Sequence, residues 1–274
     1  MNDKQRAWYV IAIGAILLVS VVLVPSFLAP GSQIGSVDYV KISVLVDNHS
    51  NGTLEAPWGL SMLVETTDLA ILFDAGPLAY ALENNSVSLG IDLESTCDFA
   101  VVSHEHPDHV DGLYYISSIH DNLTMYTPYY SGQTRYWMHD FFAIEVEDTA
   151  EVSSGIAIIG MGFEQALAIN VQNLGLVVLV GCSHPGVEDI VARAIEVTNV
   201  RDVYMVIGGF HLLQASQEQI SDAIDALIQM GTENIYPLHC SGDGVTDYLD
   251  SNYAENYGEA SVGFQIALDA ASNN

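Results

Sequence analysis

Ser103-His104-Glu105-His106-Pro107-Asp108-His109 is the most informative stretch of this sequence, and it directly follows the apolar run Phe99–Val102. Where extended geometry persists past a strand end, residues two apart project to the same side, so His104 and His106 can share one cation. The turn at Pro107 lets Asp108 and His109 face a second position a few ångströms away. Imidazole nitrogens and a carboxylate oxygen are the ligands expected of zinc or a similar first-row metal. The spacing therefore predicts a metal site.

On both sides of this loop, the apolar pattern predicts a sheet-rich domain. The runs have the length and the β-branched content of strands, and they lie at Tyr39–Val46, Leu60–Glu65, Leu69–Phe73, Phe99–Val102, Ile156–Ile159, Leu167–Val171, Leu176–Val180, Val203–Ile207 and Ile235–Leu238. Two amphipathic helices are expected between the last of them, one over Val187–Ile195 and one from a capping Ser216 to Gly231. This order predicts a mixed α/β domain with its chemistry on the loops at strand ends.

Further motifs extend the pattern over most of the chain. They are Asp47-Asn48, Gly59-Leu60-Ser61, Ile71-Leu72-Phe73-Asp74-Ala75-Gly76, Gln165-Ala166-Leu167, Gly181-Cys182-Ser183-His184-Pro185-Gly186, Gly208-Gly209-Phe210-His211-Leu212 and Pro237-Leu238-His239-Cys240-Ser241-Gly242. Together with the H-x-H-x-D-H loop they resemble the metallo-β-lactamase superfamily, and within it the branch of 7,8-dihydropterin-6-yl-methyl-4-(β-D-ribofuranosyl)aminobenzene-5′-phosphate synthase. The resemblance implies an αββα sandwich, two mixed sheets flanked by helices, over residues 37–274.

The resemblance also implies a set of ligands. The first metal would be held by His104, His106 and His184, and the second by Asp108, His109 and His239. Asp74 would brace the metal loop through a hydrogen bond to a ligand, although an Asp before a Gly is more often a plain turn residue.

Two further positions are open. Cys182 stands where many relatives place a bridging Asp, so it is either a thiolate ligand or a small buried residue. His211 is expected either to contact substrate or metal, or to be a packed structural histidine. The superfamily usually supplies one more metal-binding His between the loop and the bridging position, where this chain has only His120 and His139. Those two histidines and His49 are expected to lie outside the site.

The expected site is mono- or dinuclear, with two divalent ions favoured, zinc first and manganese or iron as alternatives, and it would make hydroxide available from bound water at neutral pH. The expected activity is therefore hydrolysis of an ester or phosphoester bond in a small molecule, with Asp108 orienting the nucleophile. Two alternatives are a synthase like the one that names the branch and a metal-containing binding or sensor domain without turnover.

Charge restricts the partners of the protein. Six Lys and Arg against 35 Asp and Glu give a formal net charge of −29, so nucleic acid is not an expected partner. Within the folded part, positive charge comes only from Lys41, Arg135, Arg193 and Arg201. An anionic substrate would therefore be held mainly by the metal ions, since arginine forks are few.

The N-terminus is expected to be a membrane segment. Residues 7–24 are apolar apart from Gly14 and Ser20 and are long enough to span a bilayer, behind a polar tip at residues 1–6. Lys4 and Arg6 favour a cytoplasmic location for the tip and an extracytoplasmic location for the folded domain. Residues 25–36 are expected to form the linker between the membrane segment and this domain. Cleavage as a signal peptide, which would release a secreted enzyme, is the alternative. Sequons at Asn48, Asn51, Asn84 and Asn122 are compatible with export. Three cysteines cannot all pair within the chain, and Cys97 is expected to be a buried thiol.

Overall fold

The computed structural model describes residues 26–27, 33–50, 52–129 and 139–273. The predicted tip (residues 1–6) and membrane segment (residues 7–24) lie outside the described residues. Within the described part, no helix has the length and apolar character needed to cross a bilayer.

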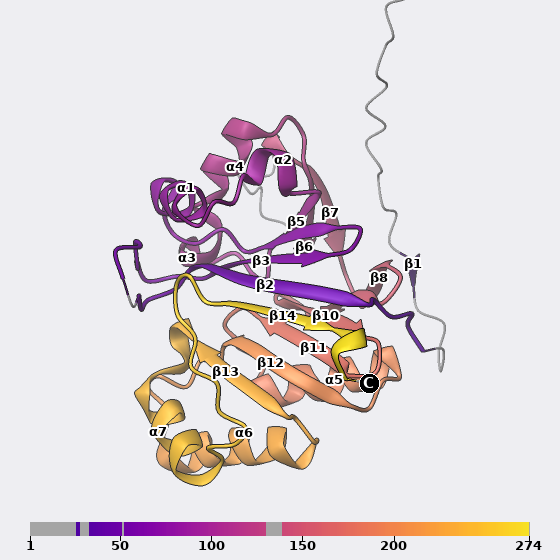
Figure 1. Cartoon of the computed structure of the whole chain (residues 1–274), viewed down its shortest axis with the longest axis vertical. Helices are drawn as coiled ribbons and strands as arrows, with labels where there is room; N and C mark the ends of the chain where they lie inside the picture. The colour runs from indigo at the N-terminus through magenta and orange to yellow at the C-terminus, as the bar shows by residue number, and fades with distance from the viewer. Residues whose placement is uncertain (1–25, 28–32, 51, 130–138, 274) are drawn as a thin grey trace, which may run out of the picture.

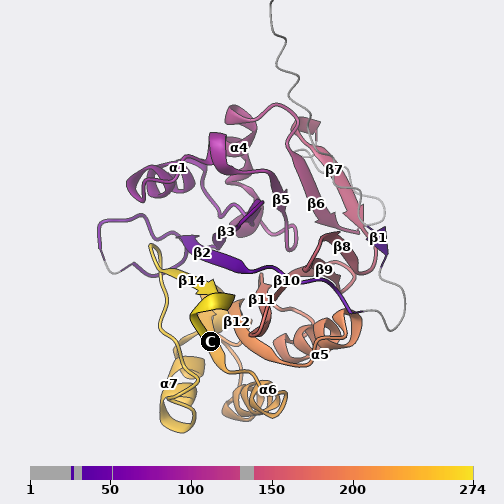
Figure 2. The ribbon, with the colours of Figure 1, turned by 45° about the vertical axis from the view of Figure 1, so that its right-hand side comes forward.

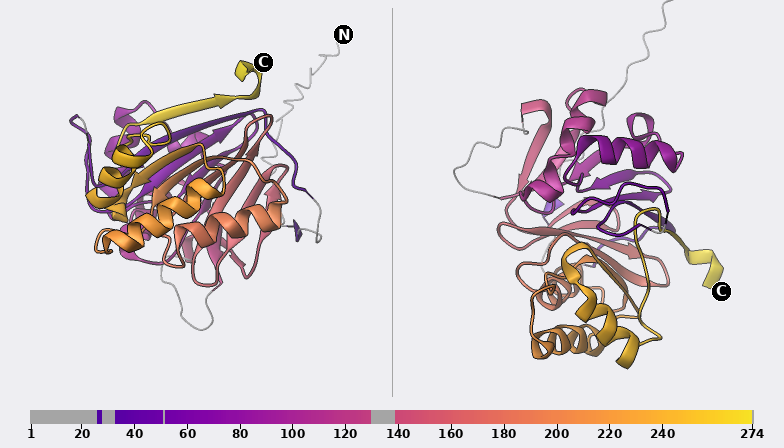
Figure 3. Two further views of the ribbon diagram at one scale, coloured as in Figure 1. Left: turned by 90° about the horizontal axis from the view of Figure 1, so that it is seen from below. Right: turned by 90° about the vertical axis from the view of Figure 1, so that its left-hand side faces the viewer.

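Two seven-stranded sheets form the centre of the described chain and pack face to face (Figures 1 and 3). The first contains, in spatial order, β14 (Gln265–Asp269), β2 (Tyr39–Val46), β3 (Ser61–Thr66), β4 (Ala70–Phe73), β5 (Phe99–Val101), β6 (Thr124–Pro128) and β7 (Phe142–Val146). The second contains β1 (Ser26–Phe27), β8 (Ala150–Ser153), β9 (Ile156–Gly160), β10 (Gln165–Val171), β11 (Gly175–Val180), β12 (Val203–Gly209) and β13 (Asn234–Leu238). Both sheets are mixed, because β4 to β7 and β11 to β13 run parallel while the other neighbours are antiparallel.

Successive side chains of a strand point to opposite faces of its sheet. One face packs in the core between the two sheets, and the other packs in the core under the helices. In β4, Ile71 and Phe73 enter the core between the sheets, whereas Ala70 and Leu72 enter the core under the helices of that side. In β11, alternate residues likewise serve the two cores. Both faces of these strands are therefore buried, which explains why they appear in the sequence as continuous apolar runs.

The helices cover the two outer faces, as the rotated view in Figure 2 shows. The first sheet is covered by α1 (Ala79–Ser88), α2 (Leu93–Thr96), α3 (Pro107–Val110) and α4 (Leu113–Ile119), and the second by α5 (Val187–Thr198), α6 (Gln217–Gln229) and α7 (Asp243–Asn252). The predicted capping box at the start of α6 is present, since Ser216 Oγ accepts from Gln219 N and the Gln219 side chain accepts from Ser216 N. The predicted sandwich of two mixed sheets flanked by helices is confirmed.

Part of the predicted linker packs on the domain. Ile34 is buried against the core under α5, and its N–H donates to the carbonyl of Thr198 at 3.1 Å. Upstream of it, Ser26 and Phe27 pair with β8. Where it is described, residues 25–36 therefore do not form a free spacer, because an apolar side chain and a strand edge of the domain both hold the segment.

Candidate metal centre

The predicted site residues meet at one end of the sandwich, directly after the carboxyl ends of strands from both sheets. Their backbones are unusual, since four non-glycine residues there have a positive φ: Asp74 (57°), Ser183 (61°), His211 (55°) and His239 (50°). Such conformations cost about 1–3 kcal/mol each and persist only where the surrounding structure imposes them. They bring the side chains toward one another.

The side chains of the first predicted group, two suggested by spacing and His184 by the resemblance, lie close together. His104 Nε2 and His106 Nδ1 are 3.0 Å apart, and the ring of His184 lies 4.8 and 4.9 Å from the rings of these two residues. One ligand atom from each of the three lies within 4.8 Å of the others. His184 therefore completes the group, and no histidine from the intervening segment is needed.

The second predicted group lies beside the first. His239 Nε2 is 3.3 Å from Asp108 Oδ2, and its ring centroid is 5.0 Å from that of His109. Ligand atoms of these three residues also lie within 4.8 Å of one another. Residues from the first half of the chain and from its far end thus share one position.

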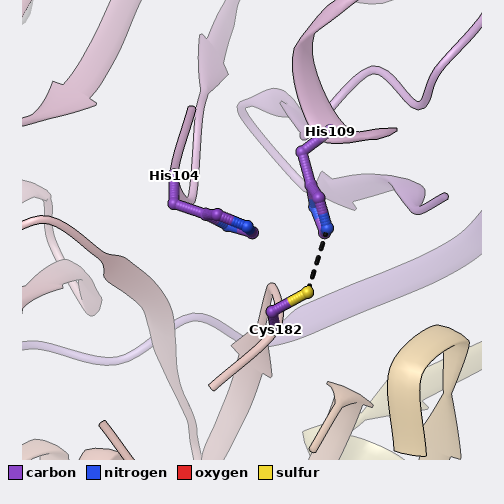
Figure 4. Close-up of side chains that lie close together, drawn as sticks. All are labelled: His104, His109 and Cys182. Carbon is purple, nitrogen blue, oxygen red and sulfur yellow. Dashed lines mark hydrogen bonds between the residues drawn. The ribbon is translucent and has the colours of Figure 1, made fainter. Parts of the chain in front are cut away.

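Cys182 lies between the two groups. Its Sγ is 3.3 Å from His109 Nε2, and Figure 4 shows the thiol and the rings of His104 and His109 directed toward one another. Cys182 also has ligand atoms of His184 and His211 on one side and of His239 and Cys240 on another within 4.8 Å. Its thiol therefore borders both predicted ligand groups.

The three cysteines are free, and Cys97 is buried as predicted.

Hydrogen bonds fix the tautomers of the histidines. His109 Nδ1 donates to Asp74 Oδ2 at 2.7 Å, and His239 Nδ1 lies 3.0 Å from Asn48 Oδ1. His104 Nδ1 is 2.9 Å from Ser103 Oγ, whose own proton is donated to Asp74 Oδ2 at 2.6 Å. With the proton on Nδ1, each of these rings presents the unprotonated Nε2 to the centre of the site.

The converging Nε2 atoms fit a metal cation. Burial, reinforced by the neighbouring imidazoles, lowers the pKa of His104, and burial also lowers the pKa of His239. These rings are therefore neutral and offer lone pairs. The Nε2 of His239 is buried and faces Asp108 Oδ2 at 3.3 Å. Neutral nitrogens, a carboxylate and a thiol directed at one space form the donor set of zinc or a similar metal.

Asp74 makes the contacts of the predicted brace. Its buried carboxylate accepts hydrogen bonds from Ser103 N at 2.7 Å, from Ser103 Oγ and from His109 Nδ1. Although burial opposes the charged imidazole, the Asp74 carboxylate raises the pKa of His109. Asp74 therefore holds both the backbone of the loop and one predicted ligand, which is more than a turn residue does.

Glu164 has an equivalent role that sequence analysis missed. It lies before β10, is fully buried, and accepts from the amides of Cys182 (3.0 Å), Ser183 (2.7 Å) and His184 (2.8 Å) and from His184 Nδ1 (2.8 Å). Burial alone would raise the pKa of this carboxyl, but the hydrogen bonds from His184 lower it, so Glu164 is ionised. One carboxylate thus orients the whole Cys182–His184 turn. A single Glu in front of an apolar run has no motif that would have revealed it.

The loop after β2 supplies further contacts. Asp47 Oδ1 accepts from His239 N at 2.7 Å, and the Nδ2 of Asn48 donates to the His239 carbonyl at 2.7 Å. Trp58 Nε1 donates to Asp108 Oδ2 at 3.0 Å, and its ring lies 4.9 Å from His239. The sequon at Asn48 is therefore a misleading signal, because its side chain is engaged in the site. Asn84 and Asn122 are exposed, and Asn51 lies outside the described residues.

Of the remaining histidines, one lies beside the site and the other three lie outside it. The ring of His211 lies 4.4 Å from that of His184 and is exposed at the rim of the site, a position suited to substrate as well as to metal. His120 contacts the carbonyl of Leu93 at 3.0 Å between two helices, and His49 and His139 are exposed. None of these three belongs to a potential ligand group within the described chain.

Glu164→Gln is expected to weaken metal binding about 10- to 100-fold. The amide nitrogen of Gln would face backbone N–H donors, so the turn that carries His184 would lose its fixed orientation. Competition between the protein and a chromophoric chelator measures the affinity. Glu196→Gln, at an exposed carboxylate of α5 that pairs with Arg193, is the matched control. Equal affinity in both variants would contradict the role of Glu164.

The sequence of the chain was compared with protein families and with known proteins. No family model matches it. It is similar to 7,8-dihydropterin-6-methyl-4-(β-D-ribofuranosyl)-aminobenzene-5′-phosphate synthase of Methanocaldococcus jannaschii, with 26% identity over 82% of this chain and 95% of that protein. A protein of the same organism described as uncharacterized is 25% identical over 73% of this chain and 90% of its own length.

Solved structures agree with this placement. Tm1679, described as a metal-dependent hydrolase of the β-lactamase superfamily, matches with a TM-score of 0.73 and 26% identity over 84% of this chain and 99% of its own. YhfI from Bacillus subtilis, described as a metallo-β-lactamase fold protein, matches with a TM-score of 0.60 and 14% identity over 83% of this chain and 99% of its own, which shows the fold alone. The chain therefore has the metallo-β-lactamase fold, and within that superfamily it resembles the branch of the dihydropterin-ribosylaminobenzene-phosphate synthase.

Proposed function

We propose that this chain is a metal-dependent hydrolase that uses two divalent ions, with zinc preferred over manganese or iron, to cleave an ester or phosphoester bond in a small molecule. The supporting observation is the pair of ligand groups, His104, His106 and His184 beside Asp108, His109 and His239, with Cys182 between them. When bound, the ions lower the pKa of a water and stabilise charge on the attacked centre.

Two side chains of the site are assigned further roles in the proposed reaction. Asp108 accepts from Trp58, and its neighbour His239 holds the pKa of this carboxyl low, at about 2, against the effect of burial. Asp108 is therefore ionised, and its carboxylate can accept a hydrogen bond from the attacking water and orient it. We assign to His211, whose ring lies 4.4 Å from that of His184, a hydrogen bond to the substrate oxygen that leaves.

The synthase-like activity is the second candidate, because the similarity to the Methanocaldococcus protein extends over most of both chains. A binding or sensor domain is the third. The full-length chain, metal-depleted and then loaded with zinc, manganese or iron, would be assayed on phosphomonoester, phosphodiester, thioester and lactone substrates. It would also be assayed for transfer of a dihydropterin-methyl group, from a donor that carries a leaving group on the methyl carbon, to a ribosylaminobenzene phosphate.

We expect hydrolysis that disappears with a chelator and returns with about two equivalents of metal, as a two-metal centre requires. Metal content by mass spectrometry accompanies each assay. Transfer without hydrolysis would favour the synthase. Stoichiometric metal without any turnover would favour the sensor.

We also propose that residues 7–24 anchor the protein and leave the domain outside the cytoplasm, as their apolar length and the charges of Lys4 and Arg6 favour. The full chain is expected in the membrane fraction, with its domain open to protease added to intact cells. A mature N-terminus after residue 24 would indicate a cleaved signal peptide instead. A full-length protein in the soluble cytosolic fraction would contradict both forms of export.

A further inference from the structure

A pocket of about 440 Å³ adjoins the candidate metal centre. Its apolar wall consists of Trp58, Leu212, Leu213 and Ala215, and its polar side chains Gln214 and Gln219 are uncharged. His211 and Cys240 also line the pocket and connect it to the centre, because the His211 ring packs against His184 and Cys240 Sγ lies 3.4 Å from Cys182 Sγ. A substrate group in this pocket therefore lies beside the reacting bond.

The apolar wall is exposed and held in position. Trp58 and Leu213 are 50% and 52% exposed and line the same pocket, and exposed apolar side chains that gather in this way mark ligand-binding grooves. Leu213 N donates to the Cys240 carbonyl at 3.1 Å, and a Cβ on Gly242 would come within 2.7 Å of Leu213 Cα. The wall is thus fixed against the turn that carries His239 and is formed before a ligand arrives.

Positive charge is missing from this pocket. The described chain contains three Lys or Arg residues, and none of them lines the pocket. Lys41 pairs with Glu65, and Arg193 pairs with Asp148 and Glu196. Arg201 precedes β12, at the opposite end of this strand from His211. A remote phosphate or carboxylate on the substrate would find no cationic partner there.

We infer that this pocket binds an uncharged, apolar group of the substrate, attached directly beside the bond that the metal centre cleaves. The inference rests on the proposed function and narrows it. Any negative charge of the substrate lies at the reacting centre, next to the metal ions, while the remote part is an alkyl or aryl group. Apolar burial then supplies the specificity, since each buried methylene contributes about 0.8 kcal/mol, which corresponds to roughly a fourfold change in affinity.

Binding of n-alkylphosphonates tests this inference without turnover. The probes run from methyl to octyl and share a headgroup that metal ions bind, and calorimetry with the zinc-loaded full-length protein measures their dissociation constants. We expect the affinity to rise up to about fourfold per methylene until the pocket is filled. A probe of the same length that ends in a carboxylate is expected to bind less tightly than the alkyl probe.

Variants locate the effect in the pocket. Leu213→Ser is expected to weaken the rise of probe affinity with the length of the alkyl chain. Leu213→Lys is expected to reverse the preference between the two probe ends, so that the carboxylate-ended probe binds more tightly than the alkyl probe. Val87→Ser, at a 67% exposed apolar side chain on α1, should leave the series unchanged. Equal affinity of short and long probes, or a wild-type preference for the charged end, would overturn the inference. Failure of the proposed hydrolysis would appear separately, as normal probe binding without turnover of any ester.

Discussion

Asp74→Ala is expected to lower the free energy of unfolding by about 3–5 kcal/mol, the usual effect of breaking a buried ionic pair. The carboxylate accepts from Ser103 N, Ser103 Oγ and His109 Nδ1, and all three donors are buried. Its removal leaves them without an acceptor and frees the imidazole of His109. Metal affinity should therefore fall together with stability. Urea unfolding of the metal-free protein and metal titration of the folded protein measure the two effects.

A matched control for this variant is Asp92→Ala, which removes an exposed N-cap carboxylate from α2. It should cost about 1 kcal/mol and leave metal affinity unchanged, since capping effects are local. Comparable losses of stability in the two variants would show that Asp74 is an ordinary turn residue.

His106→Ala is expected to reduce kcat/KM by about a thousandfold or more, roughly 4 kcal/mol of transition-state stabilisation. His106 belongs to the first ligand group, yet its side chain is exposed, so the core does not depend on it. Activity and stability should therefore separate in this variant. Turnover of whichever ester the assay identifies measures the first, and thermal unfolding without metal measures the second.

His139→Ala provides the control, because it replaces another exposed histidine that lies outside the ligand groups. It should retain full activity. If His106→Ala keeps wild-type turnover at saturating metal, the first group does not hold a catalytic ion. The hydrolase proposal would then have to rest on the second group alone.

Several elements of the fold were predictable because their signal is local. β10 and β11 are buried along their whole length and appear as uninterrupted apolar runs, and α6 shows its cap and its apolar face directly. The edge strands β7 and β14 were not predicted. Each has only five residues, most of them exposed or half-buried, and a short run of this kind does not by itself distinguish a strand from a loop or a helix.

The two carboxylates that hold the candidate ligands, Asp74 and Glu164, also differ in whether the sequence predicted them. Asp74 stands in an Asp-x-Gly motif after a strand, and its role followed from the resemblance. Glu164 makes as many hydrogen bonds but has no motif, because its partners at Cys182–His184 are defined only when β10 and β11 pair. Likewise, Trp58 and Leu213 line one pocket although neither shows a pattern in the sequence.

The sequence by itself determined the buried strands, the H-x-H-x-D-H loop and the chemical types of the candidate ligands, because apolar periodicity and residue identity act over a few positions. Only the tertiary structure decided which side chains share a position. The N–H of His239 donates a hydrogen bond to Asp47 Oδ1, 192 residues away, and this contact exists because the two sheets pack with their strand ends together. Convergence of this kind depends on how distant strands pair, and local sequence does not encode it.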